Sequence, residues 1–197
     1  GVDKTVRPHI IPPPFGEKEE QTQNADSLNT HKLSALQYPV PGIKNGVNYQ
    51  SYRQAGWGGF EFAIYCAWEY LDEETIVGAW SIQSSDAAKN PLREAQKSVR
   101  NALKRSFEDM LKTHEKWWNQ YWSRSSIAIP DAVIEAQWYR EQYKFGSASR
   151  RGAPPITLQA VWTADNRQIP PWKGDFHHDL NTELSYWPCY SSNHLEE

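Results

Sequence analysis

The residues best suited to chemistry lie together near the end of the chain, between Pro154 and Pro188. This stretch carries two tryptophans, a lysine, two adjacent histidines, a carboxylate and an amide: Trp162, Trp172, Lys173, His177, His178, Asp179 and Asn181. Pro170, Pro171 and Gly174 interrupt it, so most of it must be loop. Sugar C–H faces stack on aromatic rings, and carboxylates, amides and imidazoles bind sugar hydroxyls. The stretch therefore favours a polar cleft that binds carbohydrate.

These residues also have plainer interpretations. Asp179 and Asn181 could cap a following helix, which is the commonest role of Asp and Asn in such a place. His177 and His178 are adjacent, so in extended chain they point opposite ways, and at most one faces a given site. No other cluster with metal-ligand spacing accompanies them. We therefore expect no metal and no cofactor, and we expect one of the two histidines to bind sugar hydroxyls.

Composition excludes several classes of protein. The chain has 197 residues, of which 39% are hydrophobic and 23% charged, as in an ordinary globular protein. The formal net charge is −3 and there is no basic tract, which argues against nucleic acid as a partner. No apolar run reaches the roughly 18 residues that a membrane span needs. The two cysteines, Cys66 and Cys189, could form one disulfide, but two separate buried thiols are the simpler interpretation.

The first half of the chain has a β pattern. Residues 1–50 are rich in Pro, Gly and Asn and predict irregular chain with short strands. Two apolar runs, 59–70 and 76–83, flank a short acidic turn and predict an antiparallel hairpin in a β-sandwich. The glycines at 56, 58 and 59 indicate either a bulge or a close approach of another backbone.

The second half has a helical pattern. Asn90 and Pro91 suit a helix start, and the apolar spacing that follows runs on to Ser123. An unbroken helix of that length would span roughly 50 Å, so it must bend or cross between two domains. Within this pattern His114 lies on the apolar stripe, which predicts a histidine packed in the core.

Two further helices are expected. One runs from the cap Asp131 to about residue 145, and the other covers 180–196, with a kink or an early end at Pro188. Glu183, in the first turn of the second of these helices, is expected to be solvated.

Ordered aromatic motifs connect these elements to a known family. They are His114-(x2)-Trp117-Trp118-(x2)-Tyr121-Trp122-Ser123-Arg124, Trp138-Tyr139-(x3)-Tyr143-Lys144-Phe145-Gly146-Ser147, Pro155-(x2)-Leu158-Gln159-Ala160-Val161-Trp162, Pro170-Pro171-Trp172 and Asp179-Leu180-Asn181-Thr182-Glu183-Leu184-Ser185-Tyr186-Trp187-Pro188. In this order they resemble the start of the catalytic domain of glycoside hydrolase family 95, which includes α-L-fucosidases and α-L-galactosidases. The resemblance covers residues 87–197.

The resemblance implies a multidomain protein of α and β structure. Residues 1–88 would be the C-terminal part of an N-terminal antiparallel β-sandwich, residues 89–128 a helical linker, and residues 129–197 the truncated start of an (α/α)6 catalytic toroid. We therefore interpret the chain as a piece of a larger enzyme, secreted or periplasmic, whose general acid lies outside it. The isolated piece is expected to lack hydrolase activity.

The resemblance also implies roles for the site residues. In the family, two asparagines separated by one residue position the water that attacks the anomeric carbon, and here they correspond to Asp179 and Asn181. An aspartate could deprotonate the water itself. Trp162, Trp172, Lys173, His177 and His178 are expected to bind the substrate, an oligosaccharide or polysaccharide. The expected function is an inverting, exo-acting glycosidase, and the alternative is a carbohydrate-binding relative that does not cleave.

Overall fold

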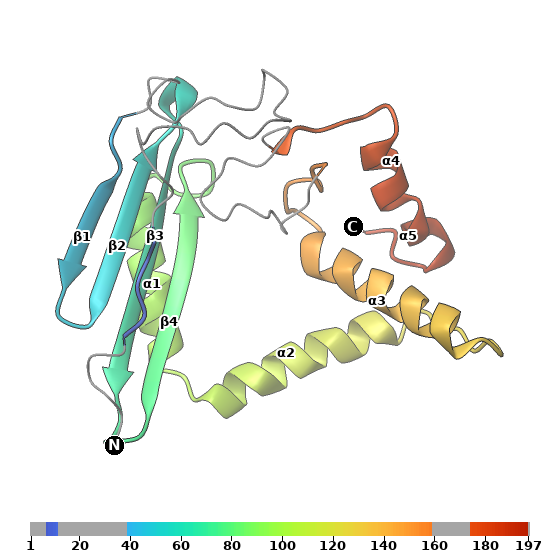
Figure 1. Ribbon diagram of the computed structural model, residues 1–197, viewed down its shortest axis with the longest axis horizontal. Coiled ribbons are helices and arrows are strands. Elements are labelled where there is room, and N and C mark those ends of the chain that lie inside the picture. Colours follow the sequence, from blue (N-terminus) through green and yellow to red (C-terminus); the bar gives the residue numbers. More distant parts are fainter. Residues whose placement is uncertain (1–6, 12–38, 159–173, 197) are drawn as a thin grey trace, which may run out of the picture. The chain divides into compact units, whose positions relative to one another are not determined.

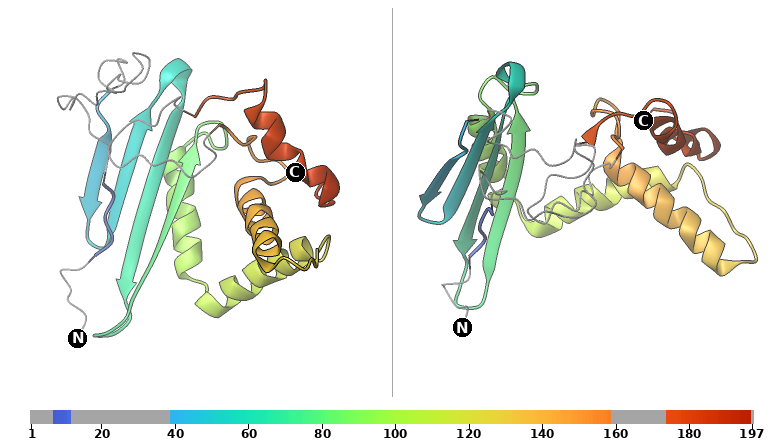
Figure 2. Two further views of the ribbon diagram at one scale, coloured as in Figure 1. Left: turned by 45° about the vertical axis from the view of Figure 1, so that its right-hand side comes forward. Right: turned by 45° about the horizontal axis from the view of Figure 1, so that its top comes forward.

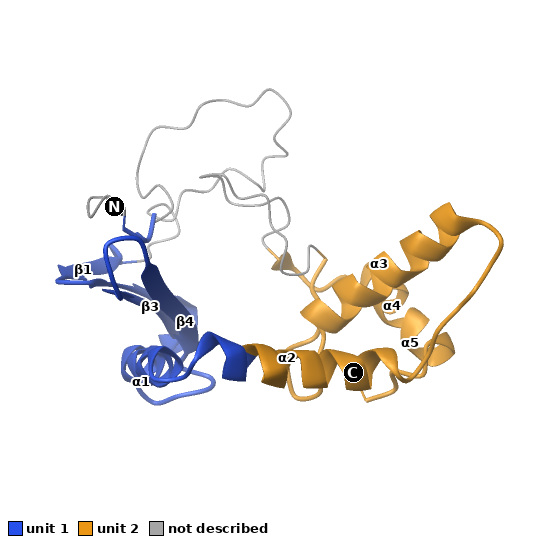
Figure 3. Ribbon diagram, turned by 90° about the horizontal axis from the view of Figure 1, so that it is seen from below, with its two compact units in different colours: residues 1–21, 31–110 blue, residues 22–30, 111–197 orange. Residues whose placement is uncertain are grey.

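The computed structural model describes residues 7–11, 39–158 and 174–196. The chain divides into two compact units, shown in different colours in Figure 3. The first comprises residues 1–21 and 31–110, and the second comprises residues 22–30 and 111–197. The domain boundaries expected at residues 88 and 128 stay predictions.

The first unit contains a four-stranded antiparallel sheet in the order β1-β2-β3-β4 (Figure 1). Its strands are β1 (Gly42–Gly46), β2 (Tyr49–Ala55), β3 (Glu61–Tyr70) and β4 (Ile76–Ser84). The hairpin predicted from the two apolar runs is confirmed, since β3 and β4 pair from Phe62 opposite Ser84 to Tyr70 opposite Ile76. The sheet and the helices that follow it confirm a protein of mixed α and β structure.

The glycines before β3 form a short 3-10 turn, η1 (Trp57–Gly59). Gly58 and Gly59 have φ angles of 65° and 86°, which residues with a side chain rarely adopt. A Cβ atom at either position would meet no atom of the described residues within 4 Å. These two glycines therefore serve the turn itself, and no described backbone approaches them closely.

Helix α1 (Pro91–Leu103) covers one face of the sheet along β3 and β4, as Figures 1 and 2 both show. It begins where predicted, because the side chain of Asn90 accepts a hydrogen bond of 3.0 Å from the backbone N–H of Arg93. Ala95 and Val99 are fully buried against Tyr65 of β3. This cluster is the core of the first unit.

The helical pattern from Pro91 to Ser123 is not one helix. It is interrupted after Leu103, and α2 (Phe107–Trp122) begins after three intervening residues. Ser106 causes the restart, since its hydroxyl accepts a hydrogen bond of 3.1 Å from the backbone N–H of Asp109. A capping serine inside a continuous apolar pattern thus starts a new helix.

The second unit is helical over its described residues, with the greater part of α2 followed by α3 (Ala132–Ala148), α4 (Asn181–Tyr186) and α5 (Pro188–Ser191). Asp131 caps α3 as predicted, accepting from the N–H groups of Val133 and Ile134 at 2.9 and 3.1 Å. The helix predicted over 180–196 is divided at Pro188, which occupies the first position of α5.

Aromatic rings pack α2 against α3. Trp118 stacks on Tyr143 with ring centroids 5.1 Å apart, and the hydroxyl of Tyr121 donates to the carbonyl of Gln142 at 2.8 Å. Gly146 lets the two helices approach closely, because a Cβ atom there would lie 2.7 Å from Cζ of Tyr121. The tryptophans and tyrosines of this region are thus helix-packing residues.

The prediction of a core histidine at position 114 is wrong. His114 is exposed on α2, and its ring touches Trp118 only at the edge, with centroids 6.2 Å apart. The histidine that packs in the second unit is His194, which is 1% exposed and stacks on Tyr121 at 3.8 Å. The apolar spacing placed His114 on a face of α2 that the described residues do not cover.

Both cysteines are buried thiols, and burial raises the pKa of Cys66. In the described part of the chain, no helix has the length and hydropathy needed to cross a membrane.

Candidate active site

The candidate site is built on α4 and on the turn that precedes it. Gly174 has a φ angle of 77°, so the chain bends there in a conformation that favours glycine. The backbone N–H of Leu158 donates to the carbonyl of Asp175 at 3.0 Å. Trp162, Trp172 and Lys173 lie outside the described residues, between these two hydrogen-bonded positions.

The turn that carries Asp179 is closed by a hydrogen bond of 2.9 Å from the N–H of Thr182 to the carbonyl of His177. Helix α4 begins at Asn181, and its N-cap residue is Leu180, with no hydrogen bond from a capping side chain. Asp179 therefore does not cap this helix, and its side chain is exposed to solvent. Of the two interpretations open for Asp179, the structure removes helix capping.

Asn181 also does not act as a cap. It is the first residue of α4, it is exposed, and its carbonyl accepts a hydrogen bond of 2.9 Å from the hydroxyl of Ser185. This hydrogen bond uses the backbone of Asn181 and not its side-chain amide. An exposed carboxylate and an exposed amide therefore lie two residues apart at the start of one helix.

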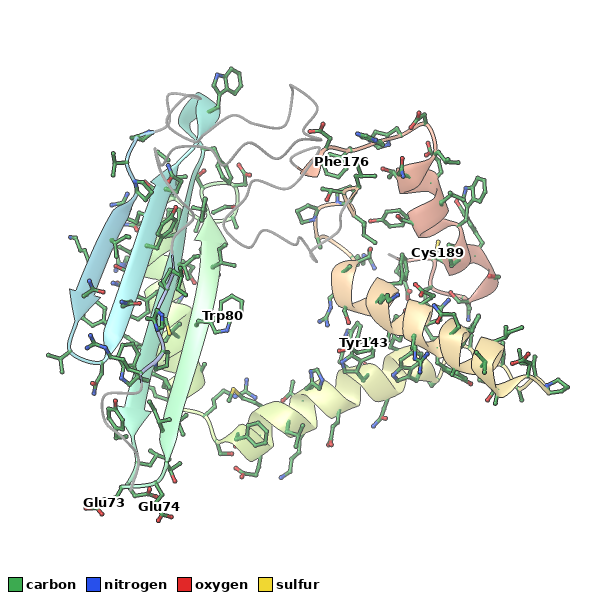
Figure 4. The ribbon with its side chains drawn as sticks, in the orientation of Figure 1. Glu73, Glu74, Trp80, Tyr143, Phe176 and Cys189 are labelled. Atoms are coloured by element: carbon green, nitrogen blue, oxygen red, sulfur yellow. The ribbon has the colours of Figure 1, made fainter. Side chains whose placement is uncertain are left out.

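The two histidines before Asp179 differ in their surroundings. His177 is half-buried, whereas His178 is exposed and stacks on Phe176 with ring centroids 6.0 Å apart and planes 19° apart. Figure 4 labels Phe176 beside this turn. The imidazole of His178 is thus the one that an incoming ligand reaches more easily.

The expectation that Glu183 is solvated is wrong. Glu183 is half-buried, and its Oε2 atom has no contact with solvent and no hydrogen-bond partner among the described residues. The hydroxyl of the neighbouring Thr182 is in the same situation. A carboxylate oxygen without a partner is costly, since removal from water is not compensated. Glu183 lies four residues after Asp179, in the first turn of α4.

Tyr186 anchors α4 to the preceding part of the second unit. Its hydroxyl accepts a hydrogen bond of 2.8 Å from the backbone N–H of Ile156, and the hydroxyl of Ser149 lies 3.3 Å away. Its ring meets Phe145 edge to face at 5.7 Å. Phe145, Ile156 and the thiol of Cys189 form the small core beneath it; Cys189 is labelled in Figure 4.

The sequence motifs contain Tyr186 only as one position among many. Its hydrogen-bond partners are 30 and 37 residues away in the chain, so no local spacing points to them. A tyrosine at the end of a short helix, directly before Trp187 and Pro188, was the available signal. Tyr186 fixes the helix whose first turn follows Asp179.

The side chains around the start of α4 can each perform a different chemical task. An exposed carboxylate can take a proton from a water molecule, an amide two residues on can orient that water, and a nearby imidazole can bind a hydroxyl. An inverting glycosidase needs a general acid and a general base on opposite faces of the sugar ring. Asp179 and Asn181 are of the residue types from which the water-activating side of a glycosidase centre can be built.

Sequence comparison assigns the same class. The model of the glycosyl hydrolase family 95 catalytic domain matches residues 93–197, and the chain belongs to this family. The resemblance given by the ordered aromatic motifs is thereby confirmed.

Two curated relatives agree with this assignment. The chain is 26% identical to a probable alpha-fucosidase A from Aspergillus niger, over an alignment that covers 50% of the chain and 15% of that protein. It is 21% identical to alpha-L-fucosidase 2 from Arabidopsis thaliana, over 55% of the chain and 16% of that protein. The chain thus spans about one sixth of the length of these relatives.

Proposed function

We propose that this chain carries the water-activating half of the active site of an inverting, exo-acting glycosidase. The observation that carries the proposal is the carboxylate of Asp179, which is exposed and not used to cap α4, within a match to a family 95 catalytic domain. The two relatives are named as fucosidases, which supports terminal α-L-fucosides, or the related α-L-galactosides, as the substrate class.

The proposed reaction is a single displacement. Asp179 removes a proton from a water molecule that the amide of Asn181 holds in place. The water oxygen attacks the anomeric carbon, and the glycosidic C–O bond breaks on the opposite face. A general acid from the remainder of the catalytic domain protonates the departing oxygen. Inversion requires that acid and Asp179 to be roughly 6.5–9.5 Å apart, to leave room for the water.

Substrate binding is assigned to the residues around this centre. His178, the more exposed of the two histidines, would hydrogen-bond sugar hydroxyls, while Trp162 and Trp172 would stack on the C–H faces of the ring. Lys173 would add a donor for a ring hydroxyl. No cofactor enters the reaction, because the carboxylate and the acid supply both proton transfers.

The larger architecture is part of the same proposal. The four-stranded sheet would belong to an antiparallel β-sandwich, α1 and α2 to a helical linker, and α3 to α5 to the first helices of an (α/α)6 toroid. We infer a secreted or periplasmic location, since polysaccharide substrates are found outside the cell.

The substitution Asp179→Asn in the full-length enzyme tests the proposal. Loss of a general base should lower kcat by roughly 100-fold or more. KM should change little, because the group acts mainly in the transition state. Asn181→Ala should slow turnover as well, by misplacing the water. Asp86→Asn, an exposed aspartate of the first unit, is the matched control and should keep the wild-type kcat.

The outcome separates enzyme from binding protein. A folded Asp179→Asn variant with wild-type kcat would remove Asp179 from the mechanism. A protein that binds terminal fucosides but hydrolyses none of them would instead be a non-catalytic carbohydrate-binding relative of the same fold. NMR of the product in the first minutes of reaction identifies the anomer, and retention of configuration would refute inversion.

A further inference from the structure

We propose that a groove in the first unit, apart from the candidate active site, binds an acidic polysaccharide whose sugars carry sulfate or carboxylate groups. The groove runs beside α1 and has a volume of about 1270 Å³. Six cationic side chains line it, from β2, from the segment before α1, from α1 itself and from its C-terminal cap: Arg53, Lys89, Arg93, Lys97, Arg100 and Lys104. We refer to it as the α1 groove.

The cations follow the helix. Arg93, Lys97, Arg100 and Lys104 are spaced by four, three and four residues, which places them on one face of α1. At a rise of about 1.5 Å per residue, neighbouring positions are roughly 4.5–6 Å apart along the helix axis, and the stripe is roughly 16 Å long. Such a row of charges matches a linear polyanion that bears charges at short, regular intervals.

The rest of α1 fixes this stripe in place. Ala95 and Val99, on its other side, are buried in the core that α1 forms with the sheet, so the basic face cannot rotate inward. Arg53 of β2 adds a cation from the sheet beside the helix. The packing of α1 therefore fixes the backbone positions from which these cations extend.

Most of this positive charge is not neutralised. Glu94 pairs with Lys97 at 3.2 Å, and Glu61 pairs with Arg53 at 2.6 Å. Within the described residues, the other four cations of the groove form no ion pair. Like charges three or four residues apart destabilise a helix. The groove thus concentrates positive charge in a chain whose formal net charge is −3, and a bound polyanion would relieve the repulsion.

The chemistry of the lining favours a glycan over a nucleic acid. Four side-chain amides, those of Gln83, Asn90, Gln96 and Asn101, also line the α1 groove and can bind hydroxyls. Its lining has no aromatic side chain among the described residues, whereas single-stranded nucleic acids are held largely by stacking of bases on aromatic rings. The choice of a glycan among polyanions rests on the proposed function as a glycosidase.

Isothermal titration calorimetry of the full-length protein tests the proposal. The probes are a heparin hexasaccharide for sulfate, a hexagalacturonate for carboxylate, and maltohexaose as the neutral glycan. The groove variant is Arg93→Gln/Arg100→Gln/Lys104→Gln. The control variant, Lys112→Gln/Lys116→Gln/Arg140→Gln, removes the same charge from exposed positions of the second unit.

We expect one or both acidic probes to bind and maltohexaose not to bind. The groove variant should bind at least 10-fold more weakly. The slope of log Kd against the logarithm of the salt concentration should fall by roughly one for each contact between a cation and an anionic group that the substitutions remove. The control variant should stay close to the wild type. Equal losses in both variants, or no binding of either acidic probe, would overturn the proposal. The proposal would also be overturned if an oligouridylate bound as tightly as the acidic glycans and the groove variant lost that binding.

The same samples separate this proposal from the proposed function. The Asp179→Asn variant should bind the acidic probes like the wild type, because Asp179 is not among the residues that line the α1 groove. If the protein hydrolyses no glycoside yet the groove variant still loses the acidic glycan, the binding site stands and the glycosidase proposal fails. Hydrolysis of fucosides without any binding of acidic probes would support the glycosidase proposal and overturn the binding site.

Discussion

The anchor at Tyr186 leads to a prediction whose size follows from two hydrogen bonds. Tyr186→Phe removes only the hydroxyl and keeps the ring against Phe145. The backbone N–H of Ile156 then loses its partner at 2.8 Å, in a residue that is 8% exposed. A buried N–H without a partner costs about 1–3 kcal/mol. The contact with Ser149 at 3.3 Å is longer and should add less than about 1 kcal/mol.

We therefore expect Tyr186→Phe to lower the free energy of unfolding by about 2 kcal/mol. Urea denaturation followed by tryptophan fluorescence measures this quantity. Tyr190→Phe is the matched control, because Tyr190 lies four residues later and is 72% exposed. Its substitution should change the free energy of unfolding by less than about 0.5 kcal/mol.

A double-mutant cycle with Ser149→Ala shows whether the two hydroxyls act together. If Ser149 contributes through Tyr186, the double variant should be no less stable than Tyr186→Phe alone. Additive losses would mean that Ser149 has another role. A Tyr186→Phe protein as stable as the Tyr190→Phe control would refute the anchor, and with it the argument that distant hydrogen bonds fix the helix after Asp179.

Two further predictions concern the packing of the second unit. Gly146→Ala should destabilise by about 1–3 kcal/mol in the same denaturation assay, because the new Cβ meets the ring of Tyr121, and stabilisation by the better helix former would contradict this. Burial, and next the Arg124 guanidinium, lower the pKa of His194 below its ordinary value of 6.5. The unfolded chain therefore binds a proton that the folded chain disfavours, so stability should be full above about pH 6.5 and fall below it. His194→Gln should flatten this dependence, and an unchanged pH profile would count against it.

Much of the fold was predictable because its signals are local. The hairpin of β3 and β4 follows from two apolar runs around an acidic turn, and each strand pairs with its neighbour in sequence. The caps at Asn90 and Asp131 follow from residue types that bond N–H groups two or three positions on. In each case the deciding interaction spans only a few residues.

The sequence was least informative where one local signal hid another: it predicted that the long helix must bend or cross between domains, but not where. The apolar spacing from Pro91 to Ser123 continues across Ser106, so periodicity alone does not reveal that its hydroxyl starts a new helix. The same spacing put His114 on an apolar stripe, although the burial of a side chain depends on what covers it. His194 packs on Tyr121, a residue 73 positions earlier, and no pattern in a short window encodes that contact.

The candidate site, like the fold, was predictable from the sequence only in part. The identities of Asp179, Asn181 and the two histidines came from the sequence, because a motif names residue types in order. The sequence did not show whether the side chain of Asp179 is free to act, because an aspartate before a helix is most often a cap. Only the structure shows that Leu180, and not Asp179, occupies the N-cap position of α4. The support from Tyr186 depends on partners 30 and 37 residues away. The sequence names the candidate residues, and tertiary contacts decide whether their side chains are held in place and left accessible.

The α1 groove shows that a helix can carry two periodic patterns at once. The apolar positions of α1 predict the face that packs on the sheet, and Ala95 and Val99 confirm it. The basic positions repeat with nearly the same period, but they are interleaved with the apolar ones and form no continuous tract. A search for runs of like charge therefore passes over them. Helical geometry gathers them on one face, so the charge of a surface has to be counted by face and not along the chain.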